Sequence, residues 1–444
     1  MRCPQCNAQL DDGTIFCGNC GKQIFPYQAQ GATVAYKAGE DESELPTILT
    51  SPQNPQRLTP QPPVRNYVPA SNTPPIPSSP QPPSPKRNNG RIVLFAVLAL
   101  LIVAAGALGV IALLKNNTSS TSNTSGNTPV VTNSTGVVSF SDNQNGSGQS
   151  NVVTISANGL ATPPSGSQYD AWLVDTQSEH IFTLGTLTKN KDGTYTAKTT
   201  SNHNQLGRGN KVEITLEQGA VSLPTGKVVL AATFPPLAFV HIRHLLVSFP
   251  NTPGNIGLMV GLVDQAQKLS ASSQLLQSIA GGGNTFAIQC AAQSIVDIAE
   301  GAQGPHYQQL SNNCASQNVI QNGDGYGLLG TNGYIANGQA HASLAATQTD
   351  ATTSIKVHAG HVNICLGNMK GWITTIDNDA LALLNNPGNT AKVQEIVTLA
   401  NHALNGVDIN GDESIDPVPG EGGANTAYYH AHLMAGLVLA PSAS

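Results

Sequence analysis

The sequence predicts a multidomain membrane protein in which a small cysteine-rich head, a single transmembrane helix, an antiparallel β-sandwich and an all-α helical bundle follow one another. Three observations predict this order: four closely spaced cysteines near the N-terminus, one long apolar run, and a change from strand-like to helix-like hydrophobic periodicity. With 44 glycines, 29 prolines and only 10% charged residues, the 444-residue chain does not have the composition of a single compact cytosolic enzyme. Its formal charge of −6 also argues against direct nucleic-acid binding.

The head, residues 1–25, contains two CxxC pairs, Cys3 with Cys6 and Cys17 with Cys20, which are separated by ten residues. Four thiolates at this spacing suit one tetrahedral Zn²⁺ ion. These residues resemble the short zinc ribbon at the N-termini of many bacterial membrane proteins. The resemblance implies a structural zinc ion whose four positions are all filled by protein, so that none remains for catalysis.

An unbroken apolar run of 23 residues, Ile92–Leu114, follows. As a helix it would be about 34 Å long, enough for a hydrocarbon core of about 30 Å. We therefore expect a transmembrane helix over 91–115; the alternative is a buried helix of a soluble domain.

Basic residues flank this run unequally, with Lys86, Arg87 and Arg91 before it and Lys115 alone after it. The positive-inside rule then places the N-terminus in the cytoplasm and the C-terminal region outside, in a single-pass protein of the plasma membrane. Two segments without enough apolar residues to fold adjoin the run, and both are predicted linkers. They are a proline-rich segment, 26–90, and a segment rich in Ser, Thr and Asn, 116–149.

A β-domain is predicted over 150–235. Lys211–Glu217 alternates polar and apolar residues, which is typical of a strand with one buried face. Asp192-Gly193 and Thr225-Gly226 supply turns. Repeated short strands of this kind predict a small antiparallel sandwich. The expected strands are Val152–Ile155, Tyr169–Val174, His180–Leu187, Thr194–Thr199, Lys211–Glu217 and Lys227–Ala232.

Several motifs in this stretch resemble the extracellular domain of anti-sigma-K factors of the RskA type, over about residues 151–234. They are Gly159-Leu160, Pro163–Gly166, Tyr169–Asp175, Leu184-Gly185, Asp192–Tyr195, Val212–Glu217 and Pro224–Ala231. The resemblance implies a single-pass regulator that sequesters a sigma factor in the cytoplasm. In that family a sigma-binding helical domain precedes the membrane span, whereas this chain has the zinc ribbon and the proline-rich linker there, so no sigma-binding residues carry over.

Helical periodicity dominates 240–440, as in Val393, Ile396, Val397, Ala400 and Leu404. Glycine and proline breaks divide this region into about five or six helices of a bundle. The expected helices are Ile256–Ala280, Thr285–Ala302, Tyr334–Ala346, Thr353–Asn385, Thr390–Asn405 and Asn425–Leu439.

Nine of the eleven histidines lie in this helical region. Separations of three, four and seven residues place His358, His361 and Cys365 on one side of a single helix, where they could hold copper, zinc or haem iron. His241 and His244 repeat the three-residue step, and His341 is a candidate neighbour on another helix. The alternative is that these histidines are ordinary polar residues that hydrogen-bond to the backbone.

Alternate oxygen donors in the segment 408–421 resemble the calcium loops of dockerins and related secreted modules. Two departures are Glu413, where the loop normally has glycine, and Pro419, where it has an acidic residue. A solvated acidic turn is the alternative. The candidate calcium ligands are Asp408, Asn410, Asp412, Ser414, Asp416 and Glu421.

Three cysteines remain, Cys290, Cys314 and Cys365. An oxidising compartment favours a Cys290–Cys314 bridge that leaves Cys365 free, although the sequence allows three pairings. Taken together, the features predict a membrane regulator or sensor with a sigma factor as its candidate partner. The alternative is a cell-surface module that binds metal or haem. An enzyme is not expected, because no nucleophile–base or acid pair stands out.

Overall fold

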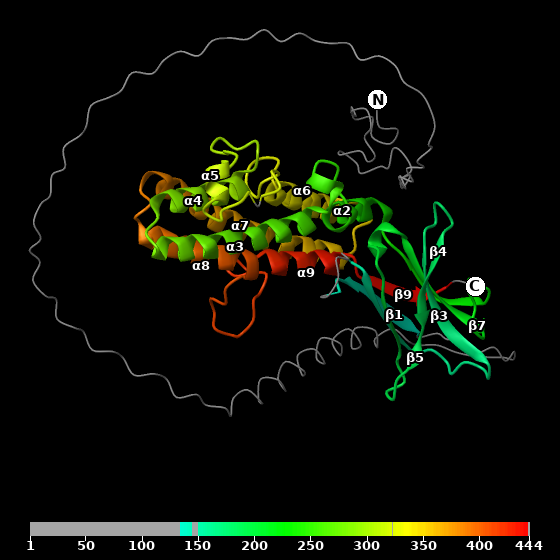
Figure 1. Cartoon of the computed structure of the whole chain (residues 1–444). Coiled ribbons are helices and arrows are strands. Elements are labelled where there is room, and N and C mark those ends of the chain that lie inside the picture. Colours follow the sequence, from blue (N-terminus) through cyan, green and yellow to red (C-terminus); the bar gives the residue numbers. More distant parts are fainter. Residues whose placement is uncertain (1–133, 144–149, 322, 443–444) are drawn as a thin grey trace, which may run out of the picture. The chain divides into compact units, whose positions relative to one another are not determined.

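A computed structural model describes residues 134–143, 150–321 and 323–442 of the chain (Figure 1). These residues form an antiparallel sheet and a set of helices that pack on one another. The predicted zinc ribbon at 1–25, the linker at 26–90 and the apolar segment at 91–115 lie outside the described residues.

In the part of the chain that the structure describes, nine strands form one sheet, in the order β4-β3-β7-β8-β9-β1-β2-β6-β5. Every pair of neighbouring strands is antiparallel. The side chain of Thr199 in β6 donates a hydrogen bond to the carbonyl of Leu184 in β4, so strands near the two ends of this order also meet. The strands are β1 (Thr135–Ser141), β2 (Val152–Asn158), β3 (Ser167–Val174), β4 (Ile181–Thr186), β5 (Thr188–Lys189), β6 (Tyr195–Thr200), β7 (Lys211–Gln218), β8 (Lys227–Thr233) and β9 (Leu437–Pro441).

The last strand, β9, lies in the middle of this sheet. It pairs with β1 through Gly136 opposite Leu439, and with β8 through Ala231 opposite Ala440. Figure 1 shows the red β9 among cyan and green strands, although residues 234–436 separate it from β8 in the sequence. The helical region is therefore an insertion between two strands of one sheet.

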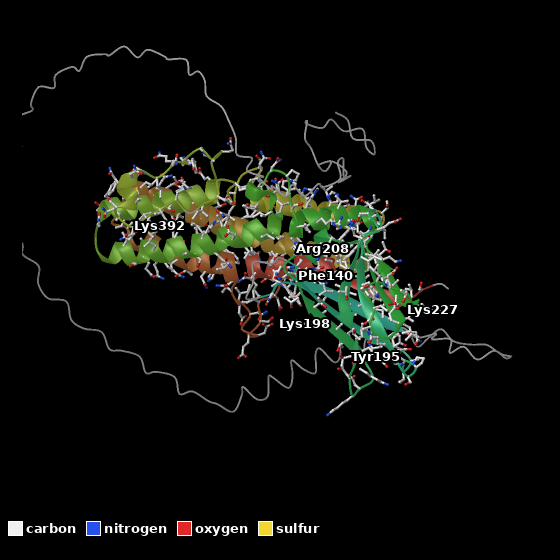
Figure 2. The ribbon with its side chains drawn as sticks, turned by 45° about the vertical axis from the view of Figure 1, so that its right-hand side comes forward. Phe140, Tyr195, Lys198, Arg208, Lys227 and Lys392 are labelled. Atoms are coloured by element: carbon white, nitrogen blue, oxygen red, sulfur yellow. A yellow bond between two sulfur atoms is a disulfide. The ribbon has the colours of Figure 1, made fainter. Side chains whose placement is uncertain are left out.

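Alternation of buried and exposed side chains explains why these segments are strands. In β1 every second residue is buried, including Val138 and Phe140. Figure 2 labels Phe140 and Tyr195, which come from different strands and belong to the same core cluster. One face of β1 thus removes apolar area from water, which stabilises the sheet by about 25 cal/mol per Å².

The motif residues that carry the family resemblance have structural roles. Trp172 is 1% exposed, and its indole Nε1 donates a hydrogen bond of 2.8 Å to Thr215 Oγ1. Tyr169 packs edge-on against Tyr195 and donates to the carbonyl of Ala161 at 2.9 Å. Core packing with a satisfied polar tip accounts for both aromatic residues.

The inserted helices bury apolar faces against one another. Asn284 and Thr352 cap two of them, because each side chain accepts a hydrogen bond from a backbone N–H in the first turn. Gly301 follows the C-terminal end of the helix that Asn284 caps, and its φ of 73° favours glycine. The helices are α2 (Pro236–Leu246), α3 (Leu258–Gly281), α4 (Thr285–Glu300), α5 (Asn312–Ala315), α6 (Tyr334–Thr347), α7 (Thr353–Asn385), α8 (Thr390–Asn405) and α9 (Ala424–Met434), with short 3₁₀ turns at Gln205–Gly207 and Pro253–Asn255.

Helix α2 fixes the insertion to the sheet. Phe234, just after β8, stacks on Phe239 with ring centroids 3.9 Å apart, and the Arg243 guanidinium lies 4.5 Å from the same ring. Arg243 also donates to the carbonyls of Leu206 and Gly209, at 2.8 and 3.0 Å. The N-terminus of α2 is held by hydrogen bonds from its backbone to Asp350. Aromatic stacking and charge-assisted hydrogen bonds therefore join the two parts.

The three cysteines of the described part have the pairing that an oxidising compartment favours. Cys290 and Cys314 form a disulfide, which links α4 to α5, and Cys365 is a free, buried thiol.

The predicted fold class is wrong. None of the helices in residues 134–143, 150–321 and 323–442 is long and apolar enough to cross a membrane. In place of a sandwich followed by a separate bundle, the structure has one continuous sheet with the helices inserted in it. The expected linker at 116–149 contains β1, and the expected helix Asn425–Leu439 ends at Met434. It ends there because Leu437 and Leu439 alternate with exposed Val438 and pair with β1.

Two candidate metal centres

Three histidines meet in the interior of the helical region. His241 and His244 lie on α2 and His341 on α6. The Nδ1 atom of His341 lies 3.0 Å from Nδ1 of His241 and 3.2 Å from Nδ1 of His244. The three residues are 0%, 2% and 5% exposed. This group is called the buried histidine cluster below.

The local sequence explains how the cluster forms. A three-residue step puts His241 and His244 on one side of α2, which packs against α6. The ring of Phe249 closes one side, with its centroid 5.0 Å from that of His341 and 5.5 Å from that of His244. The side-chain amide of Gln348 lies 3.3 Å from Nε2 of His241. Three ring nitrogens therefore face one another in an apolar setting.

Burial sets the protonation state of this cluster. Loss of solvation lowers the pKa of His241 to about 4 and that of His341 to about 3, and it lowers the pKa of His244 well below its usual value. All three rings are therefore neutral near pH 7. Neutral imidazole is the form that binds a metal ion.

A second group, the half-buried histidine cluster, has the same plan. His358 and His361 lie on α7, and His430 lies on α9. Nδ1 of His430 is 3.0 Å from Nδ1 of His358 and 3.3 Å from Nδ1 of His361. Burial lowers the pKa of His430 to about 4 and also lowers that of His358. His358 and His361 are partly exposed, so this cluster is open to solvent on one side.

These are the two groups of at least three His, Cys, Asp or Glu side chains with ligand atoms within 4.8 Å of one another in the described part of the chain. Three nitrogens that converge on one point fit a single ion with His ligands, for which zinc and copper are usual. The same convergence does not fit haem, whose iron takes at most two axial ligands from opposite faces.

The sequence-predicted set of His358, His361 and Cys365 is only partly brought together. Cys365 lies on the same helix but packs against Gly422, away from the histidines, and burial raises the pKa of its thiol to about 12. His430 occupies the third position instead, and sequence reasoning missed it. The only signal for it was the pair His430 and His432 in the last predicted helix.

The predicted calcium loop connects α8 to α9, and its side chains form hydrogen bonds within the loop. Asp408 accepts hydrogen bonds from the backbone N–H groups of Gly411 and Glu413, at 2.6 and 2.9 Å. Glu421 is fully buried and accepts from the N–H groups of Ile409 and Asp416, at 3.3 and 3.0 Å. The structure therefore gives calcium binding no support, and it shows these carboxylates bonded to backbone N–H groups of the same loop. The remaining candidates bond in the same local way: Asn410, Asp412, Ser414 and Asp416.

A carboxylate that the sequence did not single out lies between α4 and α7. Burial raises the pKa of Asp377 to about 6, and the nearby charge of Glu300 adds to this effect while His306 opposes it. One oxygen of Asp377 is buried with no hydrogen-bond partner among the described residues. His306 donates from its backbone and pairs through Nδ1 with the Glu300 carboxylate, both at 2.7 Å. The ionised form of Asp377 is thus disfavoured in the folded protein.

Asp377→Asn is expected to stabilise the protein at pH 8 by about 1–2 kcal/mol, allowing for partial solvent screening, and to have little effect at pH 4. The folded-state pKa lies above the unfolded value of 3.8, so this group makes the protein less stable as the pH rises from about 4 to about 6, and the loss is complete above that range. Urea unfolding at both pH values measures the difference. Asp412→Asn, on the exposed loop, is the control, and an equal effect of Asp377→Asn at both pH values would contradict the prediction.

The fold and the two clusters define a class of protein: an antiparallel β-domain with a helical insertion that contains two groups of three histidines. Residues 93–228 match the family described as anti-sigma-K factor rskA, C-terminal. Residues 2–24 match the family described as zinc-ribbon domain. No curated protein and no solved structure matches the chain.

Both resemblances seen in the sequence are thereby confirmed. The rskA match ends just inside β8, before the helical insertion begins. It supports a regulatory role on a sigma factor, and the zinc-ribbon match supports zinc binding at the N-terminal head. The four cysteines of that head, Cys3, Cys6, Cys17 and Cys20, lie outside the described residues.

Proposed function

We propose that this chain is a regulator of a sigma factor, in which the β-domain and its helical insertion act together as a sensor. The observation that carries the proposal is the rskA match, whose described part contains strands β1 to β7. Because β9 completes the same sheet after the insertion, a change in the helices can alter the strands directly. The zinc-ribbon head is the proposed site of contact with the cytoplasmic partner.

The described part is proposed to work outside the cytoplasm. The Cys290–Cys314 disulfide supports this placement, because such bonds persist in oxidising compartments. The role is proposed to be non-enzymatic. Ser150 Oγ lies 2.9 Å from His432 Nε2, but Ser150 is fully buried, which suits a structural contact better than a nucleophile.

Crosslinking in the source cells, followed by capture of the tagged full-length chain and mass spectrometry, tests the regulatory role. We expect a sigma factor among the crosslinked proteins, and we expect its target transcripts to change when the chain is overproduced. The variant Cys17→Ser/Cys20→Ser, which disrupts the zinc head, should lose the crosslink at unchanged protein level. Failure of the intact chain to crosslink a sigma factor, together with unchanged transcripts, would overturn the proposal.

A second candidate function, reversible binding of a transition-metal ion, is favoured by the half-buried cluster. Its three Nδ1 atoms converge, and two of its histidines are partly exposed, so an ion has access from solvent. The metal content of the purified chain distinguishes this function. His430→Gln should remove one exchangeable ion if the cluster binds metal, and should change nothing if it does not.

A further inference from the structure

We propose that the buried histidine cluster, His241, His244 and His341, binds one first-row divalent transition-metal ion, such as Zn²⁺, through its three Nδ1 atoms. This centre would join α2 to α6. The inference does not depend on regulation of a sigma factor, and it concerns a different site from the half-buried cluster.

The first reason is that the three nitrogens cannot satisfy one another. Nδ1 of His341 makes two close contacts, of 3.0 and 3.2 Å, with Nδ1 of His241 and of His244. In a neutral imidazole each ring nitrogen carries either one proton or one lone pair. If Nδ1 of His341 carries a lone pair, it can accept one good hydrogen bond. If it carries a proton, it can donate one good hydrogen bond. Nδ1 of His341 therefore cannot make a good hydrogen bond to both of its nitrogen neighbours, and hydrogen bonding among the three rings does not account for both short contacts.

A bound cation removes this conflict, because it binds all three lone pairs together. With zinc–nitrogen distances of about 2.0–2.1 Å and tetrahedral angles, ligand nitrogens lie about 3.3 Å apart. The observed separations of 3.0 and 3.2 Å are close to this spacing. Small rotations of the rings are enough to reach it.

The second reason is that the chain builds the same arrangement twice. In each cluster two histidines three residues apart on one helix meet a third histidine from a neighbouring helix, and in each the contacts run through Nδ1. The two clusters use different pairs of packed helices, α2 with α6 and α7 with α9. Repetition of a three-nitrogen geometry on two different helix pairs points to a common chemical purpose.

The surroundings suit a metal-bound imidazole. A histidine that binds through Nδ1 keeps its proton on Nε2, and that proton usually finds an acceptor in the outer shell. The Gln348 amide, 3.3 Å from Nε2 of His241, supplies this acceptor once its oxygen faces the ring. The three neutral rings fill three positions and leave the fourth for water or another small ligand.

The position of the cluster gives the ion a structural consequence. Helix α2 is tied to the sheet by Arg243, which donates to two backbone carbonyls beyond β6. An ion shared with His341 would connect α6 to that anchored helix. We therefore expect metal binding to raise the melting temperature of the full chain.

The test compares matched variants of the full-length chain, His341→Gln for the buried cluster and His430→Gln for the half-buried one. Each protein is incubated with Zn²⁺, desalted, and analysed for zinc by mass spectrometry. We expect His341→Gln to contain one zinc ion fewer per chain than the wild type. Unchanged zinc content in a His341→Gln protein with a wild-type circular dichroism spectrum would overturn the proposal.

A second measurement leaves the buried cluster intact, in case His341→Gln does not fold. The chain with His430→Gln, and with all four head cysteines changed to serine, retains only the buried cluster among the candidate centres. Incubation with Co²⁺ should give one bound ion with visible d–d absorption and without the near-ultraviolet bands of thiolate ligation. Absence of bound Co²⁺ from this folded variant would also overturn the proposal.

Discussion

Leu439→Ala is expected to lower the free energy of unfolding by about 3–4 kcal/mol, although only five residues of the given sequence follow Leu439. Leu439 is fully buried. It lies in β9, which pairs with both β8 and β1, and it is opposite Gly136 of β1. Truncation leaves a cavity in the core and weakens the strand that pairs with both β8 and β1. Urea unfolding followed by circular dichroism measures the change.

Val438→Ala is the matched control, because Val438 is on the same strand with its side chain 72% exposed. We expect it to change the free energy of unfolding by less than about 0.5 kcal/mol. Because the helices are inserted between β8 and β9, the strand and helix signals of Leu439→Ala should shift together. If the helical signal of Leu439→Ala is lost at the same urea concentration as in the wild type, the helical insertion folds independently of the sheet.

Local patterns were sufficient for most elements. Thr353–Asn385 and Thr390–Asn405 have the same bounds in the prediction and in the structure, because their apolar period is regular and their ends carry turn residues. The alternation of Lys211–Glu217 likewise predicted β7. Each of these elements is determined by residues close to one another in the sequence.

The two strands in the middle of the sheet, β9 and β1, were missed for a different reason. β9 has five residues and is separated by two residues from the end of a helix, and a short apolar run of that length does not distinguish a strand from a helix end. Its partner β1 lies about three hundred residues earlier, in a segment rich in Ser, Thr and Asn. The pairing is a long-range contact, so no local pattern shows it.

In the candidate sites, too, the sequence revealed local neighbours and did not reveal partners from distant segments. The three-residue step on one helix revealed His358 with His361 and His241 with His244, but the third ligand comes from another helix. Cys365 shares the side of α7 with His358, yet seven residues correspond to about 10 Å along the helix axis, too far for one ion. In the loop at 408–421, oxygen atoms at alternate positions form local turns as readily as a calcium site.

Replacing the disulfide in Cys290→Ser/Cys314→Ser is expected to lower the free energy of unfolding by about 3.5 kcal/mol. The bridge closes a loop with a sequence separation of 24, and such a loop restricts the unfolded chain by about that amount. Dithiothreitol should therefore lower the melting temperature of the wild type and leave the variant unchanged. Cys365→Ala is the control, because this thiol is free and the bridge remains; its smaller cavity should cost about 1 kcal/mol and preserve the response to dithiothreitol. A wild-type melting temperature that does not respond to reductant would mean that the bridge does not constrain the helical insertion, and the support for an oxidising compartment would be lost with it.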